Sequence, residues 1–150
     1  MGVTMLATIL ICTILYCHDG DTCKCVDAKK KEYTIRLANI DSPELKYRKC
    51  NPQPYAIEAA HFINEKIKGK SVKIELGKND IYGRTLGTIY LGKEDINGLM
   101  VQNGFAEVYR DHRFESNQYY KFELGAKQKK LNIWSLKDYT SPMYQREKCK

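Results

Sequence analysis

The chain has 150 residues, of which 43% are hydrophobic and 29% are charged. This composition excludes a disordered chain and is typical of one folded domain with a real core. Its 25 lysines and arginines exceed its 18 aspartates and glutamates, so the net charge is +7. Such a charge favours polyanions, nucleic acid before an anionic membrane. A basic surface without any partner is the alternative.

An apolar stretch, residues 5–16, comes first. It is too short to span a bilayer comfortably, and it has neither a basic residue ahead of it nor a small-x-small cleavage site. We therefore keep two interpretations of residues 1–12, an apolar leader or an extension of strand one. Residues 13–136 form the folded domain and 137–150 a C-terminal tail. The apolar start favours a secreted or membrane-associated protein over a cytoplasmic one.

The rest of the domain alternates between strand and helix patterns. Segments rich in alternating or β-branched residues predict five strands, at 13–17, 22–26, 33–40, 71–76 and 86–91. Helical spacing of apolar residues predicts three helices, at 54–67, at 95–104 and at about 117–131. In the last helix we expect Tyr120, Leu124 and Leu131 to face the core. The order predicts an α+β domain built on a small closed five-stranded barrel.

The six cysteines do not form a zinc signature. Cys23 and Cys25 flank one lysine on a predicted strand, which places both sulfurs on one face. We interpret them as small apolar residues, with metal binding as the minor alternative. Cys50 and Cys149 could pair if the protein is exported, but the sequence alone leaves this open.

A cation and two carboxylates lie together where the third strand ends. Arg36 is charged within an apolar run, which is costly unless an anion meets it. Pro43 stops the strand because proline lacks a ladder donor. Asp41 and Glu44 therefore stand where a ligand can reach them.

Two further segments are expected to converge on this strand end. One is the acidic turn that contains Asp21, and the other runs from Asp80 to Arg84. Carboxylates and carbonyls suit a hard cation such as calcium, and two arginines can hold a phosphate bidentately. Taken singly, each element has a plain alternative, namely a hairpin turn, an Asx turn or a structural salt bridge. Their co-occurrence predicts a phosphodiester-cleaving site.

With these residues in hand, the chain resembles the staphylococcal nuclease-like (thermonuclease) domains. The resemblance rests on five segments in the family's order: His18-Asp-Gly-Asp-Thr22, Arg36-Leu-Ala-Asn-Ile-Asp-Ser-Pro-Glu44, Asp80-Ile-Tyr-Gly-Arg84, Asn103-Gly-Phe-Ala106 and Leu131-Asn-Ile-Trp134. It implies an OB-fold barrel with three helices. It also implies a calcium-dependent phosphodiesterase that cuts DNA and RNA at the P–O5′ bond and leaves 3′-phosphate ends.

The resemblance also implies a role for each matching residue. Asp21 and Asp41 would be carboxylate ligands of Ca²⁺, and Ser42, in place of the commoner threonine, would offer its carbonyl. Arg36 and Arg84 would hold the scissile phosphate, and Glu44 would serve the attacking water. Tyr82 would lie along the nucleotide, with Tyr109 as a second aromatic neighbour whose alignment is ambiguous.

The expected protein is thus a monomeric, sugar-nonspecific nuclease that prefers single-stranded or unwound DNA and RNA. No protein partner is implied, and the apolar N-terminus allows membrane association. The competing hypothesis is a non-catalytic OB-fold module that binds nucleic acid or a protein. The discriminating feature is completeness, because a binding module does not need Asp21, Asp41 and Glu44 together beside phosphate-binding arginines.

Overall fold

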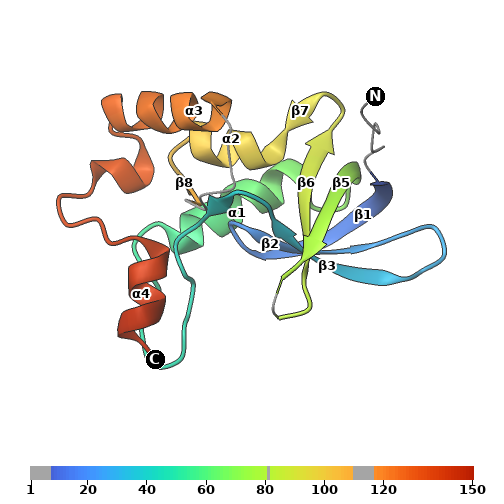
Figure 1. The fold of residues 1–150 in the computed structure, drawn as a ribbon, viewed down its shortest axis with the longest axis horizontal. Coiled ribbons are helices and arrows are strands. Elements are labelled where there is room, and N and C mark those ends of the chain that lie inside the picture. The colour runs from blue at the N-terminus through green and yellow to red at the C-terminus, as the bar shows by residue number, and fades with distance from the viewer. Residues whose placement is uncertain (1–7, 81, 110–116) are drawn as a thin grey trace, which may run out of the picture.

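The computed structural model describes residues 8–80, 82–109 and 117–150. Its centre is a closed barrel of five strands (Figure 1). These are β1 (Thr8–Asp19), β2 (Thr22–Val26), β3 (Glu32–Leu37), β5 (Ser71–Asn79) and β6 (Thr85–Leu91). They are ordered β3-β2-β1-β5-β6, and a parallel pairing of β3 with β6 closes the barrel. The expected α+β fold with an OB-like barrel is confirmed.

The remaining elements cover the barrel and extend from it. Helix α1 (Ala56–Ile67) packs on β1, and α2 (Ile96–Gln102) packs on β6 and on α3 (Asn117–Gln128). Short strands β4 (Ile40–Asp41) and β8 (Glu107–Val108) pair with each other, while β7 (Glu94–Asp95) borders β6. A 3-10 turn, η1 (Asn132–Ser135), precedes α4 (Pro142–Lys148). No helix in the described ranges is long and apolar enough to cross a membrane.

The described residues contain four α-helices, so the expected number of three is wrong. The additional helix, α4, lies in the segment predicted as a C-terminal tail. Its start is stabilised locally, because the Ser141 hydroxyl accepts a hydrogen bond from the Tyr144 N–H and Pro142 occupies the first turn. In Figure 1 this helix lies away from α2 and α3, beside the loop that follows β4.

Most strand predictions hold, but β1 runs beyond the predicted 13–17 into residues for which an extension of strand one was one of the two interpretations. The predicted first strand spans 13–17, whereas residues 8–13 also pair with residues 71–76 of β5. In α1 the predicted spacing is confirmed, and Ala59, Ile63 and Ile67 are fully buried. That helix begins after Tyr55, which takes a left-handed conformation (φ 70°).

The predicted inward face of α3 is wrong at Leu124, whose side chain is 57% exposed. The buried positions are Tyr119, Glu123 and Ala126. Two of these are polar and are buried because they have partners: the Tyr119 hydroxyl donates to Asp95, and Glu123 accepts from the Val108 N–H. A search for apolar periodicity passes over such residues.

Cys23 and Cys25 are buried, as expected of small apolar residues, but both are also disulfide-bonded, which the sequence did not indicate. Cys23 is bonded to Cys17, and Cys25 is bonded to Cys12. Strands β1 and β2 are antiparallel neighbours, so their inward faces adjoin. A register shift in β1 after Ile14 turns Cys17 to the same buried side as Cys12. Both sulfurs of β2 therefore meet a partner inside the barrel.

Candidate active site

The end of β3 folds around the side chain of Arg36. The chain reverses after Leu37 at Asn39, which has a φ of 68°, so the strand is shorter than the predicted 33–40. The Arg36 guanidinium donates from Nη1 to the carbonyls of Leu37 at 2.6 Å and Ile40 at 2.9 Å. Because these bonds hold the turn, β4 brings Asp41 back to the same guanidinium.

Two aspartates from separate strand ends share one nitrogen of Arg36. Arg36 Nη2 lies 3.3 Å from Asp21 Oδ2 and 3.4 Å from Asp41 Oδ1. Asp21 Oδ2 also accepts the Ser42 N–H at 2.8 Å. The acidic turn after β1 and the segment after β3 therefore meet, with both aspartates buried. We call this edge of the barrel, with Asp21, Arg36, Asp41 and Glu44, the rim.

Gly20 is needed for space where the acidic turn meets the next segment. A Cβ at this position would collide with the side-chain oxygen of Ser42. The Asp-Gly pair is therefore more than a hairpin signal, because the missing side chain lets the two segments touch. The Ser42 hydroxyl oxygen is itself buried, and no residue in the described part of the chain hydrogen-bonds to it.

The carboxyl groups of the rim differ in pKa. Burial alone would raise the pKa of Asp21, but the Arg36 charge and hydrogen bonds from its neighbours hold it below its usual value. Burial raises the pKa of Asp41, and it raises the pKa of Glu44 as well. Burial and the adjacent Asp21 charge together raise the pKa of Asp19 to about 9. Asp19 is thus a fourth carboxyl group at the site and is protonated at neutral pH.

Replacement of Asp19 by asparagine should stabilise the calcium-free protein at alkaline pH. With a folded pKa of about 9 against 3.8 for the free group, the folded state binds the extra proton between these values. Protonated Asp19 therefore adds to the free energy of unfolding at acid pH. This stabilisation is lost as the pH rises toward the folded pKa, with a slope of up to about 1.4 kcal/mol per pH unit. Urea unfolding in chelator should show a stability advantage of Asp19→Asn over wild type that grows from pH 5 to pH 9. An advantage that is constant with pH would contradict this assignment.

Glu44 is fixed through its backbone by Gln53. The Glu44 N–H donates to Gln53 Oε1, and the Gln53 N–H donates back to the Glu44 carbonyl, both at 2.9 Å. These bonds close the loop that follows Pro43. The Glu44 side chain keeps 19% exposure, so it faces the rim rather than the core.

A third arginine, Arg146 of α4, binds two of the predicted functional carboxylates. Its Nη1 and Nη2 contact Asp41 Oδ1 and Oδ2 at 3.1 and 2.9 Å, and Nη1 contacts Glu44 Oε1 at 2.5 Å. These contacts raise the pKa of Arg146 above its ordinary value although burial opposes the shift. The site therefore includes a residue from the predicted C-terminal tail.

Arg84 lies next to the site through the barrel but does not contact its carboxylates in the structure. It directly precedes β6, whose first residues pair with β3 at Ile35 and Arg36. Its Nε binds Asp80 Oδ2 at 2.7 Å, and its side chain is 33% exposed. The same carboxylate accepts the backbone N–H groups of Tyr82 and Arg84. Asp80 thus shapes the turn and holds the guanidinium near the surface.

The two predicted aromatic neighbours lie on different loops, Tyr82 between β5 and β6 and Tyr109 directly after β8. Tyr82 is 74% exposed, and the Arg84 guanidinium lies 5.4 Å from its ring centre. The Tyr109 N–H donates to the carbonyl of Asn39, in the turn before Asp41. An exposed ring beside an arginine suits stacking on a base, whereas Tyr109 is tied to the turn by its backbone.

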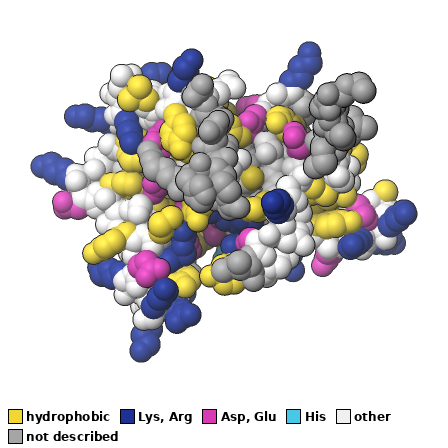
Figure 2. Space-filling model, viewed as in Figure 1, with side chains coloured by type: hydrophobic (Ala, Val, Ile, Leu, Met, Phe, Trp, Pro, Cys, Tyr) yellow, Lys and Arg dark blue, Asp and Glu magenta, His cyan; other side chains and the backbone are white. Residues whose placement is uncertain are grey.

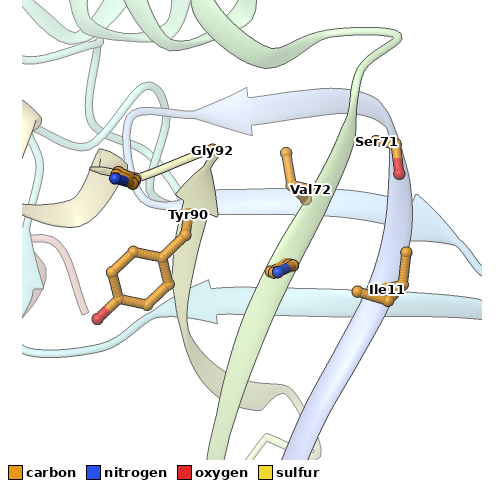
Figure 3. A pocket seen from close by; sticks show the side chains of 7 residues that line it. Ile11, Ser71, Val72, Tyr90 and Gly92 are labelled. Atoms are coloured by element: carbon orange, nitrogen blue, oxygen red, sulfur yellow. The ribbon is translucent and has the colours of Figure 1, made fainter.

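A surface hollow lies elsewhere on the barrel, across β1, β5 and β6 (Figure 3). Its volume is about 380 Å³, and its lining includes Ile11, Val72 and Tyr90. It contains two lysines but no carboxylate and no arginine among its lining residues. The acidic rim, rather than this hollow, has the side chains that phosphate chemistry requires.

The oxygen donors of the rim fit calcium only in part through side chains. Asp21 and Asp41 provide hard anionic oxygens that meet at one nitrogen of Arg36. Among the described residues, no group of three or more His, Cys, Asp or Glu side chains has the spacing of a metal site. A calcium ion would therefore also need carbonyl and water oxygens, which its flexible coordination accepts.

Sequence reasoning missed two residues of this cluster. Asp19 was visible in the acidic turn, where a second carboxylate two residues from Asp21 signals a coupled pair. Arg146 had no local signal, because its approach depends on the position of α4. A disulfide between Cys50 and Cys149 fixes that helix to the loop after Glu44, which confirms the pairing that the sequence left open.

Comparison with known proteins gives an independent view of the same residues. The family model described as "Staphylococcal nuclease homologue" matches residues 34–136. The chain is 34% identical over 121 residues to the "Thermonuclease" of Staphylococcus hyicus, covering 78% of this chain and 71% of that protein. It is also 34% identical over 128 residues to a "Probable endonuclease" of Botryotinia fuckeliana, covering 77% of this chain and 48% of the relative.

A third relative, an uncharacterized protein of Bacillus anthracis, is 32% identical over 132 residues. The match covers 84% of this chain and 61% of that protein, so the chain spans about half to three fifths of some relatives. The family match covers most of the chain and includes the strand end with Arg36, Asp41 and Glu44. The chain belongs to the staphylococcal nuclease homologue family, and its nuclease-named relatives support a nuclease.

Proposed function

We propose that the protein is a calcium-dependent, sugar-nonspecific nuclease that hydrolyses DNA and RNA to 3′-phosphate ends. The observation that supports this most is the shared Arg36 nitrogen, within 3.4 Å of both Asp21 and Asp41. Glu44 stands on the same rim. Phosphodiester hydrolysis needs two carboxylates that can bind a metal ion, a cation that can bind phosphate and a further carboxylate that can act on water.

Each residue has a distinct task in this mechanism. Asp21, Asp41 and the Ser42 carbonyl would hold calcium, which supplies positive charge opposite the phosphate. Arg36 and Arg84 bind phosphate oxygens and stabilise the charge that grows in the transition state. Arg84 must exchange its ion pair with Asp80 for phosphate, which the partial exposure of its side chain permits.

Glu44 orients the attacking water and accepts its proton as the oxygen bonds to phosphorus. The bond from phosphorus to the 5′ oxygen breaks, the leaving oxygen takes up a proton from solvent, and the phosphate stays on the 3′ side of the cut. Because arginines and metal contact the backbone only, little sequence preference is expected. Tyr82 offers an exposed ring for an unstacked base, which favours single-stranded or unwound substrates.

The surface charge suits a nucleic-acid substrate, and the disulfides suit a secreted protein. On the face shown in Figure 2, Lys and Arg side chains project from several sides of the outline. With a net charge of +7, affinity for nucleic acid should fall steeply with salt. All six cysteines are paired in the structure, which suits an oxidising compartment and a secreted protein.

A calcium-titrated cleavage assay with end-group analysis tests the proposal. Single-stranded DNA and RNA should both be cut only with calcium, and chelator should stop the reaction. The products should carry 3′-phosphate and 5′-hydroxyl ends. Binding of single-stranded DNA without any cleavage at any calcium concentration would favour the non-catalytic binding module instead.

A further inference from the structure

The C-terminal helix places a positive charge directly on the candidate site. Arg146 forms a bidentate ion pair with both oxygens of Asp41, whose side chain is 2% exposed. The same guanidinium binds Oε1 of Glu44 at 2.5 Å. In this arrangement one arginine holds a predicted metal ligand and the predicted water-binding carboxylate at once.

The formal charges of the rim indicate that Arg146 and a calcium ion balance the same carboxylates. The carboxylates of Asp21, Asp41 and Glu44 face the two guanidinium groups of Arg36 and Arg146. With Arg146 in place, one formal negative charge remains. With Arg146 withdrawn, two remain, which equals the charge of one divalent cation. Arg146 and calcium therefore act on the same carboxylate, and both cannot use the two Asp41 oxygens in the observed geometry.

Helix α4 is tied at both of its ends to the loop that carries Glu44. Before the helix, Gln53 donates from Nε2 to the Thr140 carbonyl at 2.9 Å, and the same Gln53 fixes the Glu44 backbone. At the other end, the buried Cys149 is bonded to Cys50. The loop and the helix thus form a closed ring, and Arg146 points from this ring to the rim.

We propose that α4 is an inhibitory latch, in which Arg146 competes with calcium for Asp41 and the Cys50–Cys149 disulfide keeps the arginine in place. The proposal rests on the proposed calcium-dependent nuclease and names the regulation of that same site. Removal of Arg146, or release of the disulfide, should make calcium bind more tightly and should free Glu44 to act on water.

Calorimetric calcium binding to the 150-residue chain is the first measurement. Arg146→Gln should bind calcium about ten- to hundredfold more tightly than wild type, because an ion pair to a buried carboxylate no longer has to break. Lys148→Gln is the matched control, since it removes one positive charge from the exposed side of the same helix. It should leave calcium affinity nearly unchanged.

The tether is tested with the double variant Cys50→Ser/Cys149→Ser. Its calcium affinity should shift in the same direction as that of Arg146→Gln, and adding Arg146→Gln to it should bring the affinity to the level of the single arginine variant. Circular dichroism at the assay temperature verifies that each variant is folded. The calcium concentration for half-maximal DNA cleavage should fall in parallel with the dissociation constant.

The outcomes separate the latch from the nuclease itself. If wild type and Arg146→Gln bind calcium equally, or the variant binds more weakly, the latch is wrong while the nuclease proposal stands. A variant that binds calcium normally but has a raised KM for DNA would make Arg146 a phosphate contact and would also overturn the latch. If no variant binds calcium or cleaves, the proposed function fails and the latch fails with it.

Discussion

Replacement of Arg84 by alanine should lower the turnover of single-stranded DNA by about 10³- to 10⁵-fold, the range seen for a cation that stabilises phosphoryl-transfer charge. The fold should be unaffected. Arg84 is partly exposed and its partner in the structure is Asp80, and a partly exposed ion pair near the surface contributes roughly 1 kcal/mol. Steady-state cleavage at saturating calcium, with thermal unfolding in parallel, measures both effects.

Lys78→Ala is the matched control for Arg84. Lys78 is an exposed cation at the end of β5, on the same hairpin, so its loss changes the net charge equally. It should reduce DNA affinity slightly through the general field and leave turnover almost unchanged. If Arg84→Ala cuts DNA at the wild-type rate, Arg84 has no catalytic role and the assignment is wrong.

Replacement of Glu44 by glutamine should cost about 10²- to 10⁴-fold in turnover, the usual range for a lost general base. The substitution keeps the size of the side chain and leaves the backbone bonds with Gln53 intact. Calcium affinity should not fall, because Glu44 serves water rather than the metal in this mechanism. A matched control is Glu58→Gln, which removes an exposed carboxylate from the first turn of α1.

The acid limb of the wild-type pH profile should depend on Glu44. Burial raises the pKa of this carboxyl group, and the Arg146 hydrogen bond only partly opposes the shift. A general base acts in its deprotonated form, so turnover should decline as the pH falls through a pKa above the ordinary glutamate value. Glu44→Gln should lose this limb. A variant that retains both the limb and the rate would remove Glu44 from the mechanism.

The barrel could be predicted because its signals are local. Strand β2 has the predicted bounds, and β5 and β6 differ from the prediction only at their ends. The convergence of Asp21, Arg36 and Asp41 was expected because each residue stands beside a turn. The structure adds the physical means, which is a guanidinium that binds the carbonyls of its own turn and holds both aspartates.

The parts that could not be predicted depend on contacts between distant segments. Leu124 fits an apolar pattern, yet Glu123 is the buried residue because the Val108 N–H satisfies it. Cys23 finds its partner Cys17 through a register shift that no spacing rule reveals. Arg146 lies 105 residues from Asp41 in the sequence, and only a disulfide-linked helix brings it to the rim.

In the proposed mechanism Asp21 and Asp41 bracket one divalent ion while Arg36 and Arg84 face it. A crystal structure of the protein grown with calcium and a short uncleavable single-stranded DNA tests this directly. We expect anomalous density for calcium at about 2.3–2.6 Å from oxygens of both aspartates, with a DNA phosphate between the two arginines. Calcium bound away from Asp21 and Asp41, or a phosphate that contacts neither arginine, would contradict it.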